Sequence, residues 1–237
     1  MYRRRKKKAK NVRRVTFILI VGIFGVFFNL SGCEQFGALP SGDSYLRIQQ
    51  SENYNLAEDK FVNLEQNSVL SGPGFWDNPK ENWNDNFFFN SNQTRPNGLM
   101  PESKSPLPYD FHKSEGNIKF VWLGHSTILV SIDNKVILFD PIFSNTASPV
   151  SLVVKRFQPP VIDLKSLPAV DIVVVSHDHY DHLDMQTIKH LRNKGINFVV
   201  PLGLGAHLVR WGVSAEKITE LDWWDETQID GLNLICT

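Results

Sequence analysis

The stretch that decides the fold of this chain is Ser176-His177-Asp178-His179-Tyr180-Asp181-His182-Leu183-Asp184. It follows Asp171-Ile172-Val173-Val174-Val175, a short β-branched apolar run typical of a strand buried on both faces. The histidines therefore come where a buried strand ends, which is a common place for functional residues. In extended backbone His177 and His179 point to the same side, so both can bind one ion.

The residue types in this stretch indicate a metal site. Asp181 and His182 are expected to face away from the first pair and to bind a second ion, if a helix with Asp184 as its N-cap begins just after them. Three imidazoles and several carboxylates would be costly to desolvate here without a cation. Zinc suits such ligands, and iron or manganese also fits. His190 and His207, each alone in a helix-like run, are expected to have no chemical role.

The motif His177-x-His179-x-Asp181-His182 resembles the metal motif of the metallo-β-lactamase-fold hydrolases. Four further runs narrow the resemblance to the N-acyl-phosphatidylethanolamine-hydrolysing phospholipase D branch of that superfamily, and the likeness covers residues 118–237. In chain order these runs are Trp122-Leu123-Gly124-His125-Ser126-Thr127, Phe139-Asp140-Pro141-Ile142-Phe143-Ser144, Pro201-Leu202-Gly203-Leu204 and Glu220-Leu221-Asp222-Trp223-Trp224.

The resemblance implies a fold and a set of metal ligands. The fold is α/β (α+β), the N-terminal half of an αββα sandwich. His177 and His179 would bind the first of two divalent ions, and Asp181, as a catalytic residue, and His182 would bind the second. The ions would share a hydroxide that attacks the phosphorus of an N-acylated phosphatidylethanolamine, releasing N-acylethanolamine and phosphatidic acid.

Two residues outside the motif are expected to support the ligands. His125 follows a predicted strand beside a glycine, and Asp140 precedes a proline at the end of another strand. Either residue fits a role in orienting the metal ligands, and each fits a purely structural turn equally well.

The spacing of apolar residues and turn signals predicts alternating strands and helices from about Ile118 onward. The Asp133-Asn134 pair predicts a hairpin turn. Strands are predicted over Lys119–Ile132, Lys135–Phe139, Val170–Ser176, Asn197–Val200, Ile218–Leu221 and Leu232–Thr237, and helices over Met185–Arg192 and Gly205–Trp211.

Relatives in the branch complete the site with a third histidine for each ion and a bridging aspartate, all C-terminal to the Leu232–Thr237 strand. These ligands are therefore expected beyond residue 237, as in a fragment, an interrupted gene or a degenerate copy, and the four ligands present are expected to bind metal weakly by themselves. Two alternatives to the phospholipase remain: a lactonase or other hydrolase of the superfamily, and an inactive envelope lipoprotein that binds lipid or a partner.

The charge is divided unevenly along the chain. Residues 1–14 contain nine Lys and Arg and no acidic residue, which leaves 16 basic and 25 acidic residues in the rest. A body with a net charge of −9 argues against a nucleic-acid partner, and the basic cluster fits a targeting signal better.

The basic segment leads into an apolar, charge-free run, Val15–Phe28, and then Leu30-Ser31-Gly32-Cys33. This order predicts a secretory signal over residues 1–33 with a lipoprotein cleavage box. By resemblance to bacterial lipoproteins, Cys33 would be acylated and become the N-terminus, which anchors the protein to a membrane of the bacterial cell envelope. The alternative is an uncleaved signal anchor.

Residues 34–117 are polar and rich in turn signals, and they are predicted to form an irregular tether or N-terminal extension. Residues 118–237 are predicted to form an incomplete metallo-β-lactamase-like domain. Aromatic residues at 75–76, 83 and 87–89 are expected either to dock on the domain or to contact a membrane. Cys236 is expected to be packed rather than reactive, since an acylated Cys33 leaves it no disulfide partner.

Overall fold

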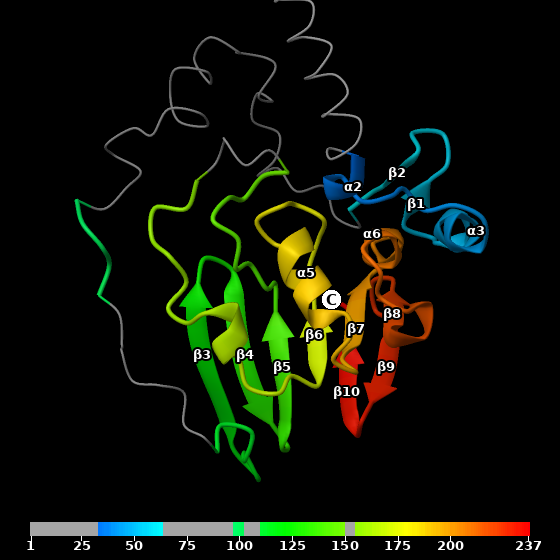
Figure 1. Cartoon of the computed structure of the whole chain (residues 1–237). Coiled ribbons are helices and arrows are strands. Elements are labelled where there is room, and N and C mark those ends of the chain that lie inside the picture. The colour runs from blue at the N-terminus through cyan, green and yellow to red at the C-terminus, as the bar shows by residue number, and fades with distance from the viewer. Residues whose placement is uncertain (1–32, 64–96, 102–109, 150–154) are drawn as a thin grey trace, which may run out of the picture.

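The computed structural model describes residues 33–63, 97–101, 110–149 and 155–237. Its centre is a six-stranded mixed sheet with the strand order β3-β4-β5-β6-β7-β8 (Figure 1). The first three strands pair antiparallel as successive hairpins, and the strands from β5 onward pair parallel. The strands are β3 (Ile118–Gly124), β4 (Thr127–Ile132), β5 (Lys135–Phe139), β6 (Ile172–Val174), β7 (Asn197–Pro201) and β8 (Ile218–Leu221).

Helices α5 (Met185–Leu191) and α6 (Gly205–Arg210) connect the parallel strands and lie on one face of the sheet (Figure 1). Parallel strands need such crossovers, and these cover the sheet face that bears Leu138, Val173 and Phe198. Single 3-10 turns, Leu164–Ser166 and Ala215–Lys217, precede β6 and β8. The carboxyl ends of β5 and β6 therefore meet at one edge of the sheet, where the histidine-rich stretch begins.

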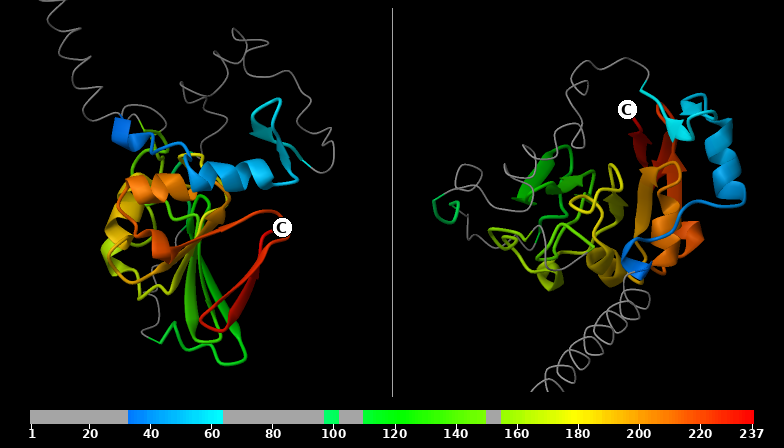
Figure 2. Two further views of the ribbon diagram at one scale, coloured as in Figure 1. Left: turned by 90° about the vertical axis from the view of Figure 1, so that its right-hand side faces the viewer. Right: turned by 90° about the horizontal axis from the view of Figure 1, so that it is seen from above.

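The opposite face of the sheet carries a second, smaller core. The hairpin of β9 (Glu226–Ile229) and β10 (Leu232–Ile235) begins to cover this face, as Figure 2 shows for the red segment. Leu232 is buried there against Ile172 and Val199. The residues adjacent to these two in the strands, Val173 and Phe198, point to the helix-covered face, because side chains alternate along a strand. Strand β6 is thus packed on both sides, as its apolar run predicted.

The predicted elements are largely confirmed, including the Asp133-Asn134 turn between β4 and β5. One prediction was wrong: the Lys119–Ile132 segment is two strands. Gly124 and His125 both have positive φ angles, 106° and 47°, and they turn the chain back on itself before β4. Strand β9 was not predicted, and the last strand ends at Ile235 rather than at Thr237.

The segment predicted as an irregular tether is more ordered than expected. It contains the short helices α2 (Cys33–Gln35) and α3 (Asp43–Gln50) and the two-stranded sheet of β1 (Tyr54–Asn55) and β2 (Lys60–Phe61). The indole of Trp211 donates a 2.7 Å hydrogen bond to the Glu34 carbonyl. Asn53 likewise donates to Asp222. Residues 33–63 therefore pack on the domain.

Two further predictions concern other parts of the sequence. The signal over residues 1–32 and the aromatic residues at 75–76, 83 and 87–89 lie outside the described residues. Within the part of the chain that the structure describes, no helix is both long enough and apolar enough to cross a membrane.

Candidate metal centre

Asp140 is the centre of a hydrogen-bond network at the carboxyl ends of β5 and β6. Its backbone is fixed because its N–H donates to the Val174 carbonyl and its own carbonyl accepts from the Thr127 hydroxyl, both at 2.9 Å. Its carboxylate accepts the Ser176 N–H at 2.7 Å and the Ser176 hydroxyl at 2.8 Å. Nδ1 of His182 lies 2.9 Å from the same carboxylate.

These bonds determine which nitrogen of each imidazole is free. A carboxylate only accepts, so Nδ1 of His182 carries the proton and Nε2 keeps its lone pair. The Ser176 hydroxyl gives its proton to Asp140 and so accepts from Nδ1 of His177, 2.9 Å away. Nε2 of His177 is then also unprotonated. A carboxylate that orients an imidazole in this way is typical of metal-binding histidines.

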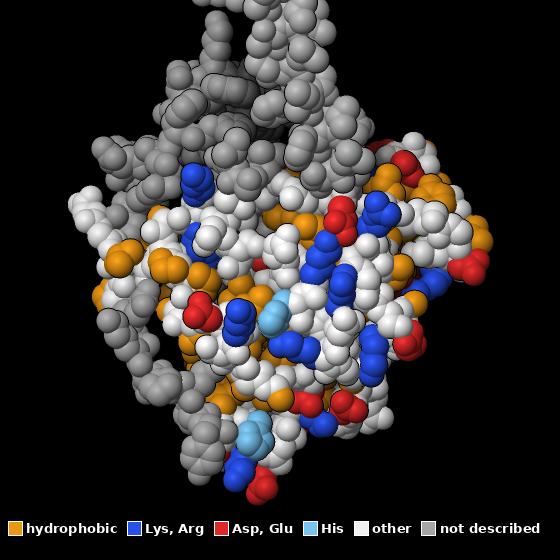
Figure 3. All heavy atoms as spheres, viewed as in Figure 1, with side chains coloured by type: hydrophobic (Ala, Val, Ile, Leu, Met, Phe, Trp, Pro, Cys, Tyr) orange, Lys and Arg blue, Asp and Glu red, His pale blue; other side chains and the backbone are white. Residues whose placement is uncertain are grey.

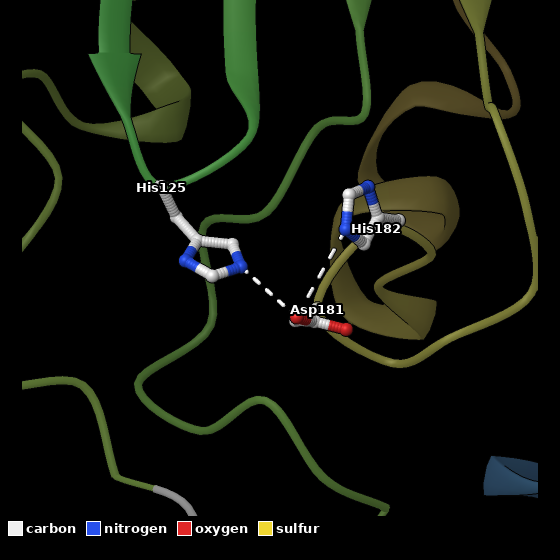
Figure 4. A group of neighbouring side chains, drawn as sticks. All are labelled: His125, Asp181 and His182. Atoms are coloured by element: carbon white, nitrogen blue, oxygen red, sulfur yellow. Dashed lines mark hydrogen bonds and ion pairs between the residues drawn. The ribbon is translucent and has the colours of Figure 1, made fainter. Parts of the chain in front are cut away.

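The turn between β3 and β4 brings His125 to Asp181 (Figure 4). Nε2 of His125 lies 3.0 Å from Oδ2 of Asp181, and the Ser126 hydroxyl donates to the Asp181 carbonyl at 2.9 Å. The Trp122 indole holds the turn by donating to the His125 carbonyl at 2.7 Å. Oδ2 of Asp181 is in turn 3.9 Å from Nε2 of His182. Within the described residues, His125, Asp181 and His182 offer ligand atoms that all lie within 4.8 Å of one another.

His177 and His179 lie in the loop after β6, and their ring centroids are 4.7 Å apart. The ring of His177 lies against that of His182, with centroids 4.0 Å apart. The expectation that His182 faces away from the first pair was therefore wrong. The chain turns at residues 180–182, where His182 N–H donates to the His179 carbonyl, and this turn brings His182 back over His177.

The cluster also sets the protonation states that metal binding requires. Burial lowers the pKa of His177, and the neighbouring His182 and His179 lower it further, so the ring is neutral near pH 7. Burial raises the pKa of Asp181, but the hydrogen bond from His125 and the charges of the nearby imidazoles outweigh it, and the pKa is lowered on balance. Neutral imidazoles and an ionised carboxylate are the forms that bind divalent ions.

Three other residues near the motif have structural contacts. Asp184 is buried and caps α5 by accepting from Gln186 N–H at 3.0 Å, as predicted, while Ser144 binds the same carboxylate. His207 stacks on Trp211, and its Nδ1 accepts from Ala38 N–H at 3.2 Å. Ser176 links Asp140 to His177, and the sequence analysis missed it. Its place directly before the first histidine was the only available signal.

The donor set fits a divalent cation. Nε2 of His182 lies 3.9 Å from the Asp181 carboxylate, the His177 ring packs against that of His182, and the Asp140 carboxylate orients His182 from the side of Nδ1. Zinc, iron and manganese all accept such ligands. His177, His179, Asp181 and His182 lie together in this cluster, and His125 and Asp140 contact it from β3–β4 and β5.

Residues 135–237 match the family described as the beta-lactamase superfamily domain. An uncharacterized protein of Mycobacterium tuberculosis is 43% identical over 146 residues, which cover 60% of this chain and 39% of that protein. The N-acyl-phosphatidylethanolamine-hydrolyzing phospholipase D 1 of Caenorhabditis elegans is 40% identical over 125 residues, 50% of this chain and 35% of that protein. A metal-dependent hydrolase of Saccharolobus solfataricus is 33% identical over 119 residues, 49% of this chain and 47% of that protein.

The chain thus spans less than half the length of these relatives. Among solved structures, a metallo hydrolase of the archaeon Ignicoccus hospitalis aligns with a TM-score of 0.36 and 23% identity over 48% of this chain and 43% of that one. The sequence relatives and the family match confirm the resemblance to metallo-β-lactamase-fold hydrolases.

Proposed function

From the beta-lactamase superfamily domain in residues 135–237, we propose that this protein is a metal-dependent hydrolase of phosphodiester bonds in phospholipids. We place the ions on His177, His179, Asp181 and His182. The observation that carries the proposal is the pair of hydrogen bonds by which the Asp140 carboxylate fixes His182 directly and His177 through Ser176. Such orientation of two adjacent rings supports the proposal, because metal-binding histidines almost always have a partner of this kind.

Two divalent ions, which we propose to be zinc, would be held by the four residues named above and would supply a hydroxide near neutral pH. Neighbouring residues of the chain keep the ligands in the protonation states that bind metal. Asp181 stays ionised because His125 donates to it, and His177 stays neutral because it is partly buried among other imidazoles. His125 and Asp140 are therefore proposed as positioning residues for the ligands.

The proposed substrate class is N-acylated phosphatidylethanolamine. Two relatives support it by name: the Caenorhabditis elegans protein described above and a mitochondrial N-acyl-phosphatidylethanolamine-hydrolyzing phospholipase D of Saccharomyces cerevisiae, 29% identical over 133 residues. The lipoprotein-type signal before Cys33 also supports a lipid substrate, since it would attach the protein to a membrane of the bacterial cell envelope.

The experiment measures hydrolysis by the full-length protein purified from its native cell. Vesicles that contain N-acyl-phosphatidylethanolamine are incubated with the protein, and released N-acylethanolamine is quantified beside bound metal by elemental analysis. We expect release that stops on chelation and in His177→Ala, and no turnover of a water-soluble lactone. Turnover of the lactone with no release from the vesicles would refute the substrate class, and a metal-free protein would refute the mechanism.

A further inference from the structure

Helix α2 fixes the start of the described chain against α5 and α6. The Glu34 carboxylate forms a 2.7 Å ion pair with Lys189 of α5, and the Glu34 carbonyl accepts from the indole of Trp211, which follows α6. Trp211 is only 2% exposed, so this contact is anchored in the core. Figures 1 and 2 both show α2 beside α6. The chain therefore leaves the domain for residues 1–32 from a defined point on its surface.

Exposed apolar side chains surround this point. Phe36 is 55% exposed, Leu39 is 86% exposed, and Val209 on α6 is 51% exposed. Leu39, Val209 and the exposed Arg210 line one groove of about 470 Å³ between residues 38–47 and α6. We call the surface formed by Phe36, Leu39, Val209 and Arg210 the α2 face.

The α2 face is also basic at its edge. The pKa of Glu34 is lowered first by its hydrogen bond with Lys189, and the charges of Arg210 and Arg192 lower it further, which places three cationic side chains around the residue that follows Cys33. Figure 3 shows Lys and Arg side chains gathered over α5 and α6. Exposed apolar residues surrounded by basic residues favour binding to an anionic lipid surface. The apolar side chains enter the headgroup region, and the basic side chains contact the lipid phosphates.

We propose that the α2 face lies on an anionic lipid bilayer and holds the metal centre close to it. The inference rests on the membrane attachment in the proposed function. It holds for either form of attachment, because the lipid on an acylated Cys33 and the apolar run 15–28 of an uncleaved anchor would both meet the bilayer just before α2.

The α2 face adjoins the site. Leu39 and Pro40 line a cavity of about 770 Å³ together with Ser176, His177 and Asp178. A lipid whose headgroup enters this cavity could stay partly in the bilayer. Because residues 33–63 pack on the domain instead of forming a long tether, they would hold the domain in a fixed orientation relative to the bilayer.

The test uses two cysteine reporters in the full-length protein, each with Cys236→Ser and with Cys33 retained for membrane attachment. Leu39→Cys reports on the α2 face, and Ile118→Cys is the matched control, because Ile118 is 64% exposed and begins β3 at the end away from His125. Both are reconstituted in phosphatidylglycerol vesicles and in detergent micelles. The rate of labelling by a membrane-impermeant maleimide is compared with that of the Cys236→Ser parent, which carries neither reporter cysteine.

We expect the vesicles to slow labelling at residue 39 several-fold and to leave residue 118 unchanged. Equal labelling rates at the two positions would overturn the orientation. A protein that does not sediment with the vesicles would overturn the orientation together with the membrane attachment. Hydrolysis of bis(p-nitrophenyl) phosphate by the same samples reports separately on the metal centre. If vesicles slow the labelling of residue 39 but the samples do not hydrolyse this substrate, the proposed hydrolase activity is contradicted and the orientation is not.

Discussion

Asp140 shows how one residue can organise a site built from three segments of the chain. It occupies a positive φ of 41°, which is costly for a residue other than glycine, and this conformation lets its carboxylate reach Ser176 and His182 together. The sequence was compatible with a ligand-orienting role and with a turn role for Asp140, but it gave no sign of the strained backbone. That strain depends on the hydrogen bonds to Val174 and Thr127, which are distant in sequence.

Asp140→Asn should lower hydrolysis by the full-length protein roughly 10–100-fold, the usual effect of losing a residue that orients a metal ligand. An amide keeps an acceptor for the Ser176 N–H, so the fold should persist, but it lacks the charge that fixes the proton on Nδ1 of His182. Steady-state kinetics and bound metal provide the measurement. Asp163→Asn, an exposed carboxylate without a capping bond, is the control. Wild-type rates in Asp140→Asn would contradict the role.

His207 should make stability depend on pH. Burial lowers its pKa below the ordinary 6.5, despite the nearby Asp178, and its Nδ1 accepts from Ala38 N–H, which requires the neutral ring. The unfolded chain therefore binds more protons, and the stability from His207 is complete above the unfolded pKa and is lost as pH falls. Melting temperatures at about pH 7.5 and 5.5 should differ more for wild type than for His207→Gln, which keeps an acceptor and cannot be charged. Equal differences would refute this assignment.

At the scale of elements, the sequence predicted what is locally encoded. The β-branched run of β6 and the Asp184 cap of α5 were clear, because strand burial and capping depend on neighbours within a few residues. The Asp230-Gly231 pair carried the same hairpin signal as Asp133-Asn134, with φ angles of 50° and 91°, and it could have predicted β9.

Other elements form only through distant contacts. Helix α3 buries a single residue, Ile48, and its sequence has no capping side chain. Arg47 of this helix reaches Glu220 in β8, 173 residues away. Such a helix has little intrinsic stability, since most helical stability in proteins comes from tertiary packing. The break at His125 is similar, because Ser126 and Trp122 stabilise it through bonds to Asp181 and to the turn itself.

Glu220→Ala should destabilise the protein by about 1–3 kcal/mol, because its carboxylate accepts from the N–H groups of Gly203 and Gly205, which would lose their partner. The bridge to Arg47 adds little, since the arginine side chain is 53% exposed. Urea unfolding of full-length variants measures the change. Glu226→Ala, at an exposed position of β9, should stay within about 0.5 kcal/mol of wild type. A similar decrease in the free energy of unfolding in both variants would show that the hydrogen bonds of the Glu220 carboxylate do not stabilise the fold.

At the scale of the whole molecule, the sequence predicted the order of strands and helices and that the histidine cluster follows β6, but not how residues 33–63 pack. The Asp222-Trp223 pair was noticed only as part of a family resemblance. In the structure, Asp222 accepts from Ser51 and Asn53 and so holds the N-terminal segment on the domain. Polar contacts across about 170 residues have no local signature, so the turn-rich composition of the segment gave no sign of this packing.

The attachment of the molecule to its membrane gives the last prediction. If Cys33 is acylated, full-length protein from labelled cells should incorporate fatty acid, and Cys33→Ala should lose the label. Several chains should be present, because one acyl chain binds membranes with only about 10⁴ M⁻¹. Cys236→Ala, which changes the partly buried cysteine after β10, is the control and should keep both label and location. A parent protein that carries no label yet stays in the membrane fraction would contradict acylation. It would show that residues 15–28 remain as an uncleaved anchor, because that apolar run holds the chain without a modified cysteine.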